Sequence, residues 1–218
     1  MKATHVLAIT IGILVYTGCY AQERRFEKDI QKFEEKDKTN PPQKKAVLFT
    51  GSSSIRFWSN LEEDFSGIPV INRGFGGAQF SDVIYFMDRI VTPYEPKTIV
   101  IYAGSHDLRK KDGGPEEVLR MFKAFRSAVR EKLPNTKICY ISMKPSLAKW
   151  ETIHLDKESN KLISDYCTQT EKTEFIDIWT PMLGDAEKPS PDYFKSDRNH
   201  PNDKCYKLWA SIIREYIE

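Results

Sequence analysis

Short apolar runs that alternate with stretches of helical periodicity constrain the fold of this chain more than any other feature. The apolar runs cover residues 46–50, 69–72, 98–103, 137–143 and 174–179. The helix-like stretches cover residues 81–90, 115–132, 155–170 and 202–217. Such alternation is typical of βαβ units, in which helices cover both faces of a parallel sheet. We therefore expect an α/β protein, a three-layer α/β/α sandwich around a central, mostly parallel five-stranded sheet.

The segments that follow the predicted strands contain the residues that could take part in binding or catalysis. In open parallel sheets, ligands bind beyond the carboxyl ends of the strands. Residues 51–54 are Gly-Ser-Ser-Ser, residues 73–77 are Arg-Gly-Phe-Gly-Gly, and residues 104–107 are Gly-Ser-His-Asp. The stretch beyond the fifth strand leads to Asp197 and His200. We expect these four segments to meet at one edge of the sheet.

Length and charge limit the function classes. A chain of 218 residues with 40% hydrophobic and 29% charged residues is typical of one soluble globular domain. The net charge is only +2, and no stripe of Lys and Arg with interleaved aromatic residues is present, so we expect no nucleic-acid partner. We place the domain at residues 44–218, after a highly charged segment, residues 22–43, that is either a spacer or a short surface helix.

The amino-terminal residues are typical of an export signal. Lys2 precedes an apolar run at residues 6–16, and small residues follow up to Ala21. We predict a signal peptide over residues 1–21 and an exported protein that is periplasmic or secreted. Thr17-Gly18-Cys19 also resembles a bacterial lipoprotein signal. If Cys19 is lipidated, the protein is tethered to a membrane.

Three cysteines remain after the predicted signal peptide: Cys139, Cys167 and Cys205. An odd number leaves at least one thiol free or paired between chains, and the sequence leaves their pairing open. Neither a CxxC pair nor a Cys/His cluster is present. We expect no metal site and no cofactor.

A serine in residues 52–54, together with Asp197 and His200, supplies the side chains of a Ser-His-Asp nucleophile. His200 is the candidate general base, and Asp197 can hold its ring in one tautomer. Backbone N–H groups at Ser53 and Gly77 and a ring N–H of His106 are candidate donors to an oxyanion. The alternative to a catalytic role for Asp197 and His200 is a solvated loop. The alternative to an oxyanion-binding role for the glycine-rich residues 74–77 is a tight turn between a strand and a helix.

The chain resembles the SGNH (GDSL-type) hydrolases, a family of serine esterases and lipases with a flavodoxin-like fold, over residues 46–217. Residues 51–53 resemble the family's Gly-Asp-Ser block with Ser in place of Asp, and the Gly-Ser-Ser-Ser form resembles a bacterial branch. Residues 72–77 match its Asn-x-Gly-x-Gly-Gly block, and residues 197–200 match its Asp-x-x-His block. The resemblance implies that Ser53 is the nucleophile and that Gly77 donates to the oxyanion.

One block departs from the family pattern. Where the family has Gly-x-Asn-Asp, this chain has Gly104-Ser105-His106-Asp107, so that His106 replaces an oxyanion-binding Asn. A neutral imidazole donates one N–H, with a reach that differs from that of an amide. Loss of one oxyanion donor typically lowers kcat by about 10²–10³-fold. The departure therefore raises two possibilities, a working hydrolase and a catalytically impaired relative.

These observations predict an exported serine esterase that removes acyl groups, acetyl or short-chain, from a small-molecule, lipid or carbohydrate ester. A first alternative is an impaired protein of the same fold that binds an acylated glycan or another ester ligand. A second is a phosphate-binding serine loop like that of the flavodoxins, which bind FMN. Trp150 and Lys149, after the fourth predicted strand, are candidate residues of the substrate cleft, with loop packing as the alternative, and Trp150 is the candidate for substrate binding. The oligomeric state is left open.

Overall fold

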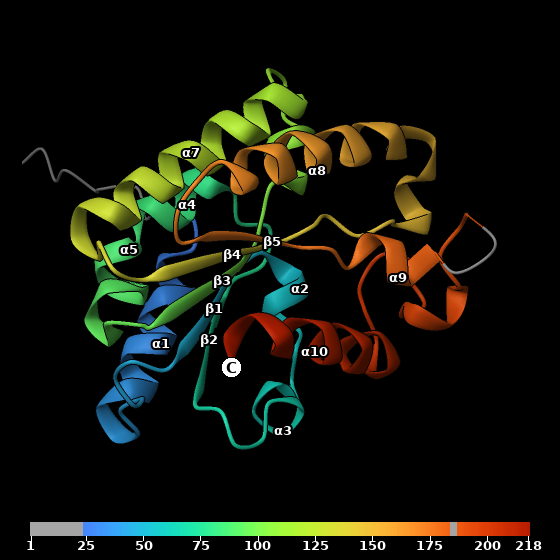
Figure 1. The fold of residues 1–218 in the computed structure, drawn as a ribbon. Coiled ribbons are helices and arrows are strands. Elements are labelled where there is room, and N and C mark those ends of the chain that lie inside the picture. The colour runs from blue at the N-terminus through green and yellow to red at the C-terminus, as the bar shows by residue number, and fades with distance from the viewer. Residues whose placement is uncertain (1–23, 184–186) are drawn as a thin grey trace, which may run out of the picture.

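The computed structural model describes residues 24–183 and 187–218, and its centre is one five-stranded parallel sheet (Figure 1). The strand order is β2-β1-β3-β4-β5. Val47 of β1 lies opposite Val70 of β2 on one side and Thr98 of β3 on the other. The predicted fold class is confirmed, and every strand pair is parallel. The strands are β1 (Val47–Gly51), β2 (Val70–Gly74), β3 (Thr98–Tyr102), β4 (Lys137–Ile141) and β5 (Thr173–Ile176).

Helices cover both faces of the sheet because its central strands are apolar on both sides. Every residue of β1 and of β3 is buried. One core lies under α1 (Glu27–Thr39), α4 (Phe80–Tyr85), α5 (Met87–Ile90), α6 (Ser105–Leu108), α7 (Pro115–Lys132) and α8 (Ile153–Thr168). The other lies under α2 (Ser53–Arg56), α3 (Leu61–Asp64), α9 (Trp179–Leu183) and α10 (Asp203–Ile217). Figure 1 shows α7 and α8 on one side of the sheet and α10 on the other.

The long helices begin and end where local chemistry favours it. Pro115 occupies the first turn of α7, followed by Glu116 and Glu117 at the positive end of the helix dipole. Asn202 caps α10, because its side-chain oxygen accepts a hydrogen bond from the Cys205 N–H. Short 3₁₀ helices, η1 (Thr92–Tyr94), η2 (Leu147–Thr152) and η4 (Pro191–Tyr193), complete the described elements.

Two predicted boundaries differ from the structure. The expected helix at residues 81–90 is divided into α4 and α5 at Phe86, whose ψ of 5° leaves the helical range. The expected strand at residues 174–179 ends at Ile176, because the Asp177 carboxylate accepts hydrogen bonds from the N–H groups of Trp179 and Thr180. That capping starts α9 where the apolar pattern still favoured a strand.

Helix α1 shows that the charged segment is a helix packed onto the domain. Ile30 is fully buried in the core, with Phe26 and Phe33 packed against it. Arg73 of β2, only 4% exposed, donates two hydrogen bonds of 2.6 and 2.8 Å to the Asp37 carboxylate. The sequence left a spacer and a surface helix as alternatives, and α1 is a helix whose apolar face and Asp37 are joined to the sheet.

Replacing Asp37 by Ala is expected to lower the free energy of unfolding by about 3 kcal/mol or more, because the buried Arg73 guanidinium loses its counter-charge. Urea denaturation followed by circular dichroism measures the change. Glu35→Ala is the matched control on the same helix, because among the described residues Glu35 forms an ion pair only with the exposed Lys38. Equal stabilities of the two variants would contradict the assigned role of the Asp37–Arg73 pair.

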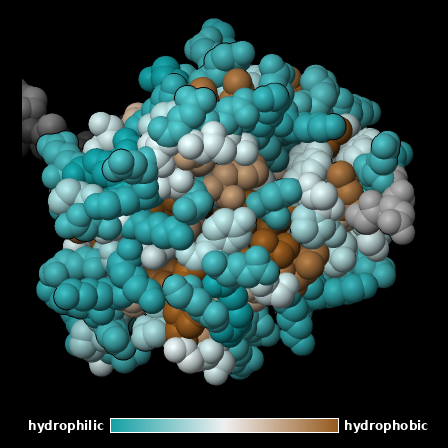
Figure 2. All heavy atoms as spheres, in the orientation of Figure 1, coloured by the Kyte–Doolittle hydropathy of each residue, from teal (hydrophilic) through white to brown (hydrophobic). Residues whose placement is uncertain are grey.

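The remaining sequence predictions concern the thiols and the amino terminus. Cys139, Cys167 and Cys205 are all buried and unpaired. The predicted signal peptide, residues 1–21, and Cys19 lie outside the described residues. Among the helices of the described ranges, none combines the length and the apolar character needed to span a bilayer. The face in Figure 2 is largely hydrophilic, with apolar residues confined to small patches.

Candidate active site

The turn after β1 places Ser53 at the carboxyl edge of the sheet. Gly51 has a φ of +116°, and a Cβ there would lie 2.1 Å from the Tyr102 carbonyl oxygen, so glycine is required. The chain then turns sharply, and Ser53 is the first residue of α2. A Cβ at Gly74 would lie 2.5 Å from the Arg56 backbone nitrogen, so this glycine lets α2 pack closely against β2. The side chain of Ser53 is thereby held above the sheet edge.

A tight loop before α10 positions Asp197 and His200. One carboxylate oxygen of Asp197 accepts hydrogen bonds of 2.9 Å from the N–H groups of Asn199 and His200. The Ser146 hydroxyl donates to the Asn199 side-chain oxygen at 2.9 Å, which ties the loop to the segment after β4. The Lys195 N–H also donates to the His200 carbonyl oxygen at 2.8 Å. These bonds fix the orientation of both side chains.

The structure brings Ser53, His200 and Asp197 into one hydrogen-bonded chain, although 147 positions separate Ser53 from His200. The Ser53 Oγ lies 2.9 Å from His200 Nε2, and His200 Nδ1 lies 2.5 Å from Asp197 Oδ2. The Phe57 ring packs edge-on against the imidazole at a centroid distance of 5.0 Å. The Ser53–His200 distance is an ordinary hydrogen-bond length, and the His200–Asp197 contact is shorter than an ordinary N–H···O bond.

Electrostatics settle which imidazole nitrogen carries the proton. Burial acts to raise the pKa of Asp197, but the hydrogen bonds from the side chain and backbone of His200 outweigh it and hold the pKa at about 2. Asp197 is therefore ionised at neutral pH and can only accept from Nδ1–H. In neutral His200, Nε2 is then free to accept the Ser53 hydroxyl proton. This is the arrangement that activates a serine hydroxyl.

Three hydrogen-bond donors lie beside the hydrogen-bonded residues Ser53, His200 and Asp197. Within the described ranges, the backbone N–H groups of Ser53 and Gly77 donate to no protein group. The His106 ring lies beside Gly77, about 4.0 Å from where a Cβ on that residue would stand. Burial, and then the positive charge of Lys149, lower the pKa of His106, so its ring is neutral at pH 7 and offers one N–H.

The comparisons with known proteins place the chain in a family. The model of the GDSL-like lipase/acylhydrolase family matches residues 47–208. The chain belongs to this family. Its members are acylhydrolases, so the protein is a hydrolase of ester bonds. No curated protein sequence matches the chain significantly.

Solved structures share the GDSL fold with this chain at low sequence identity. A candidate acylhydrolase from Bacteroides fragilis has a TM-score of 0.74 and 21% identity, over 89% of this chain and 98% of its own. A GDSL-like lipase from Bacteroides thetaiotaomicron has a TM-score of 0.68 and 19% identity, over 87% and 97%. A variant of an acetyl-xylooligosaccharide esterase from Geobacillus Stearmophilus has a TM-score of 0.61 and 18% identity, over 79% and 94%. These likenesses establish the shared fold.

In this GDSL-family protein, four of the predicted site residues border one cavity of about 390 Å³. Ser53, Gly77, His106 and His200 line it, and Asp197 lies behind His200. Sequence reasoning left out several lining residues, namely Phe57, Tyr102, Ser105, Lys144 and Asn199. Each lies at or shortly after the end of a strand, or within or beside one of the motifs, and that position is the signal that could have indicated them.

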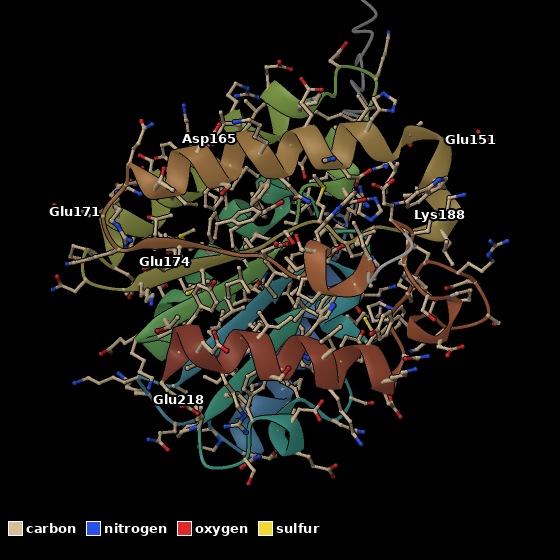
Figure 3. All side chains as sticks on the ribbon, turned by 45° about the vertical axis from the view of Figure 1, so that its right-hand side comes forward. Glu151, Asp165, Glu171, Glu174, Lys188 and Glu218 are labelled. Atoms are coloured by element: carbon tan, nitrogen blue, oxygen red, sulfur yellow. The ribbon has the colours of Figure 1, made fainter. Side chains whose placement is uncertain are left out.

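Trp150 does not border this cavity, whereas its neighbour Lys149 does. Both belong to η2, which is kinked at Lys149, where φ of −123° and ψ of 22° leave the helical range. The Trp150 ring instead lies under the Lys188 ammonium at 5.5 Å. Figure 3 shows Lys188 and Glu151, the residue after Trp150, at the end of the molecule where α8 begins. Of the two interpretations of Trp150, packing describes its surroundings in this structure.

Proposed function

We propose that this protein is a serine esterase in which Ser53 is the nucleophile, His200 the general base and Asp197 the residue that orients His200. The observation that carries the proposal is the hydrogen-bonded chain from Ser53 Oγ through His200 to Asp197. Asp197 is held ionised at neutral pH, and His200 Nε2 faces the Ser53 hydroxyl, as the reaction requires.

The reaction proceeds in two balanced halves. Ser53 Oγ attacks the ester carbonyl carbon while its proton passes to His200 Nε2, and collapse of the tetrahedral intermediate breaks the bond to the alcohol, which takes that proton. A water molecule then attacks the acyl-serine and loses a proton to Nε2. The acid leaves, and the proton returns to Ser53 Oγ. The N–H groups of Ser53, Gly77 and His106 stabilise the oxyanion in both halves.

The acyl group is acetyl or another short chain. A cavity of about 390 Å³ that also has to admit the alcohol portion leaves little room for a long acyl chain. The acetyl-xylooligosaccharide esterase with the same fold is consistent with a short acyl group on a carbohydrate or another small alcohol. We also propose that the protein is exported, on the basis of the signal-like residues 1–21, and that its Gly-Ser-Ser-Ser block places it in a bacterial branch of the family.

Hydrolysis of p-nitrophenyl esters by the purified full chain tests the proposal. We expect turnover of the acetate and the butyrate, with kcat/KM falling steeply toward the palmitate. Preference for the palmitate would contradict the short-chain assignment. Absence of turnover with every ester, in protein whose circular dichroism shows it to be folded, would contradict the esterase assignment.

The alternative to an esterase is a protein that binds an ester without hydrolysing it. This alternative depends on His106, which replaces the Asn of the family pattern. His106→Ala removes one oxyanion donor and is expected to lower kcat by about 10²–10³-fold. His106→Asn restores a neutral N–H donor at the same place and is expected to retain most of the wild-type kcat. A small kcat in the wild type that rises on His106→Asn would favour the binding protein instead. Steady-state kinetics with p-nitrophenyl acetate measures both variants.

A further inference from the structure

The cavity beside Ser53 carries positive charge that its lining does not balance. Lys144 and Lys149 border it, and among the described residues no Asp or Glu does. Asp197 lies behind His200, and its carboxylate is hydrogen-bonded to the His200 ring. The two ammonium groups therefore face a cavity without an acidic partner.

Lys144 is 6% exposed and forms no salt bridge with any described residue. Its Nζ donates to the Tyr102 hydroxyl at 3.1 Å and to Ser54 Oγ at 3.3 Å, both of which are neutral. An ammonium has three N–H donors, so within the described ranges one donor has no protein acceptor. Burial of a charge without a counter-charge is costly. A bound anion would compensate Lys144 and accept its third hydrogen bond.

Lys149 adds a second cation on the His106 side of the cavity. Its Nζ donates to Ser105 Oγ at 2.8 Å and forms no ion pair with any described residue. Burial, followed by the positive charges of Lys144 and Arg109, lowers the pKa of Lys149 to about 8. Arg109 is paired with Asp156. The negative charge of Asp156 acts to raise the pKa of Lys149, but burial and the two neighbouring positive charges outweigh it.

The side chains at the rim of the cavity add further positive charge. The Arg25 guanidinium donates to the Gly77 carbonyl oxygen at 2.9 Å, and Arg56 Nη1 lies 2.9 Å from where a Cβ on Gly76 would stand. Neither arginine forms a salt bridge in the part of the chain that the structure describes. The labelled carboxylates Glu171 and Glu174 lie at the opposite end of the sheet from Lys188 in Figure 3.

We propose that the substrate of this esterase carries a negatively charged group, a carboxylate, sulfate or phosphate, on its alcohol portion, and that Lys144 and Lys149 bind this group. The inference rests on the proposed function. The acyl group is short, so the alcohol portion is the part of the substrate that can extend toward the lysines. Charge-assisted hydrogen bonds from two ammonium groups hold the anion, and the ester carbonyl lies at Ser53.

A matched pair of acetyl esters tests this proposal: 3-acetoxybenzoate, which is anionic, and its neutral methyl ester. Each kcat/KM is divided by the rate of uncatalysed hydrolysis of the same ester. We expect the full chain to favour the anionic ester by at least about tenfold, and added salt to reduce that preference. Lys144→Met and Lys149→Met are each expected to remove most of the preference. Lys161→Met, which removes an exposed charge on α8, is the control and is expected to retain it.

Equal normalised rates for the two esters in the wild type, or a preference that survives in both lysine variants, would overturn the proposal while the esterase stands. If Lys144→Met does not fold, Lys149→Met alone tests the proposal, because Lys149 is only partly buried and its replacement is expected to leave the fold intact. If neither ester is hydrolysed and p-nitrophenyl acetate is not hydrolysed either, the esterase assignment fails. Calorimetric binding of the two esters to folded Ser53→Ala then tests the anion site alone, with tighter binding of 3-acetoxybenzoate as the expected result and equal binding as the contrary one.

Discussion

Ser53→Ala is expected to lower kcat for p-nitrophenyl acetate by about 10⁶-fold, because the variant lacks the nucleophile that His200 activates. The fold is expected to survive, since the Ser53 hydroxyl is bonded to His200 alone among the described residues and supports no part of the core. Steady-state kinetics of the wild type and the variant, with circular dichroism to verify folding, measures the effect.

Ser52→Ala provides the matched control for this prediction. Ser52 is the adjacent residue and is almost fully buried, but its hydroxyl makes no hydrogen bond to His200 in the described structure. We expect a far smaller loss than in Ser53→Ala. A folded Ser53→Ala protein that keeps a substantial part of the wild-type kcat, or a larger loss in Ser52→Ala, would show that Ser53 is not the nucleophile.

The second large effect concerns Asp197. Asp197→Asn is expected to lower kcat by about 10⁴-fold. The amide of Asn can donate to Nδ1, which favours the tautomer with the proton on Nε2, and Ser53 then has no acceptor for its hydroxyl proton. The KM of the same ester is expected to change much less, because Asp197 does not border the cavity.

Asp192→Asn is the control for the Asp197 variant. Asp192 belongs to the same stretch of chain before α10 and is exposed, and within the described ranges its carboxylate forms an ion pair only with the exposed Lys204. It is expected to keep the wild-type kcat. If Asp197→Asn also keeps the wild-type kcat, then the contact between His200 Nδ1 and the Asp197 carboxylate only positions the loop and does not contribute to the reaction.

The sequence predicted the fold because local and global patterns agree in the strands. Residues 46–50 and 98–103 are apolar on both faces, and this pattern fits only a strand covered by helices on two sides. The prediction was weaker where one side chain overrides the pattern. Asp177 ends β5 and caps α9 through two hydrogen bonds, a tertiary choice that an apolar run does not reveal.

The triad residues could be predicted because they follow strand ends and motifs, but the cationic lining could be predicted only in part. Lys149 is a candidate cleft residue from its place after the fourth predicted strand. Lys144 lies shortly after β4 ends at Ile141, yet lysines are common and usually exposed, so nothing in the sequence marks this one as buried. Trp150 and Lys149 are adjacent, and the kink in η2 at Lys149, which the sequence does not reveal, lies where the chain brings one of them but not the other to the cavity. In the same way, the sequence of α1 shows no sign that Asp37 pairs with Arg73.

The central claim, that Ser53 is a nucleophile activated by His200, is tested most directly by covalent labelling with a fluorophosphonate. In this reaction, an activated serine oxygen forms a bond to phosphorus, fluoride leaves, and the serine proton passes to the base. Mass spectrometry of the digested full chain is expected to find one adduct, on Ser53, and none on the His200→Ala variant. An adduct on another residue, or none on Ser53 in protein that hydrolyses p-nitrophenyl acetate, would contradict the account.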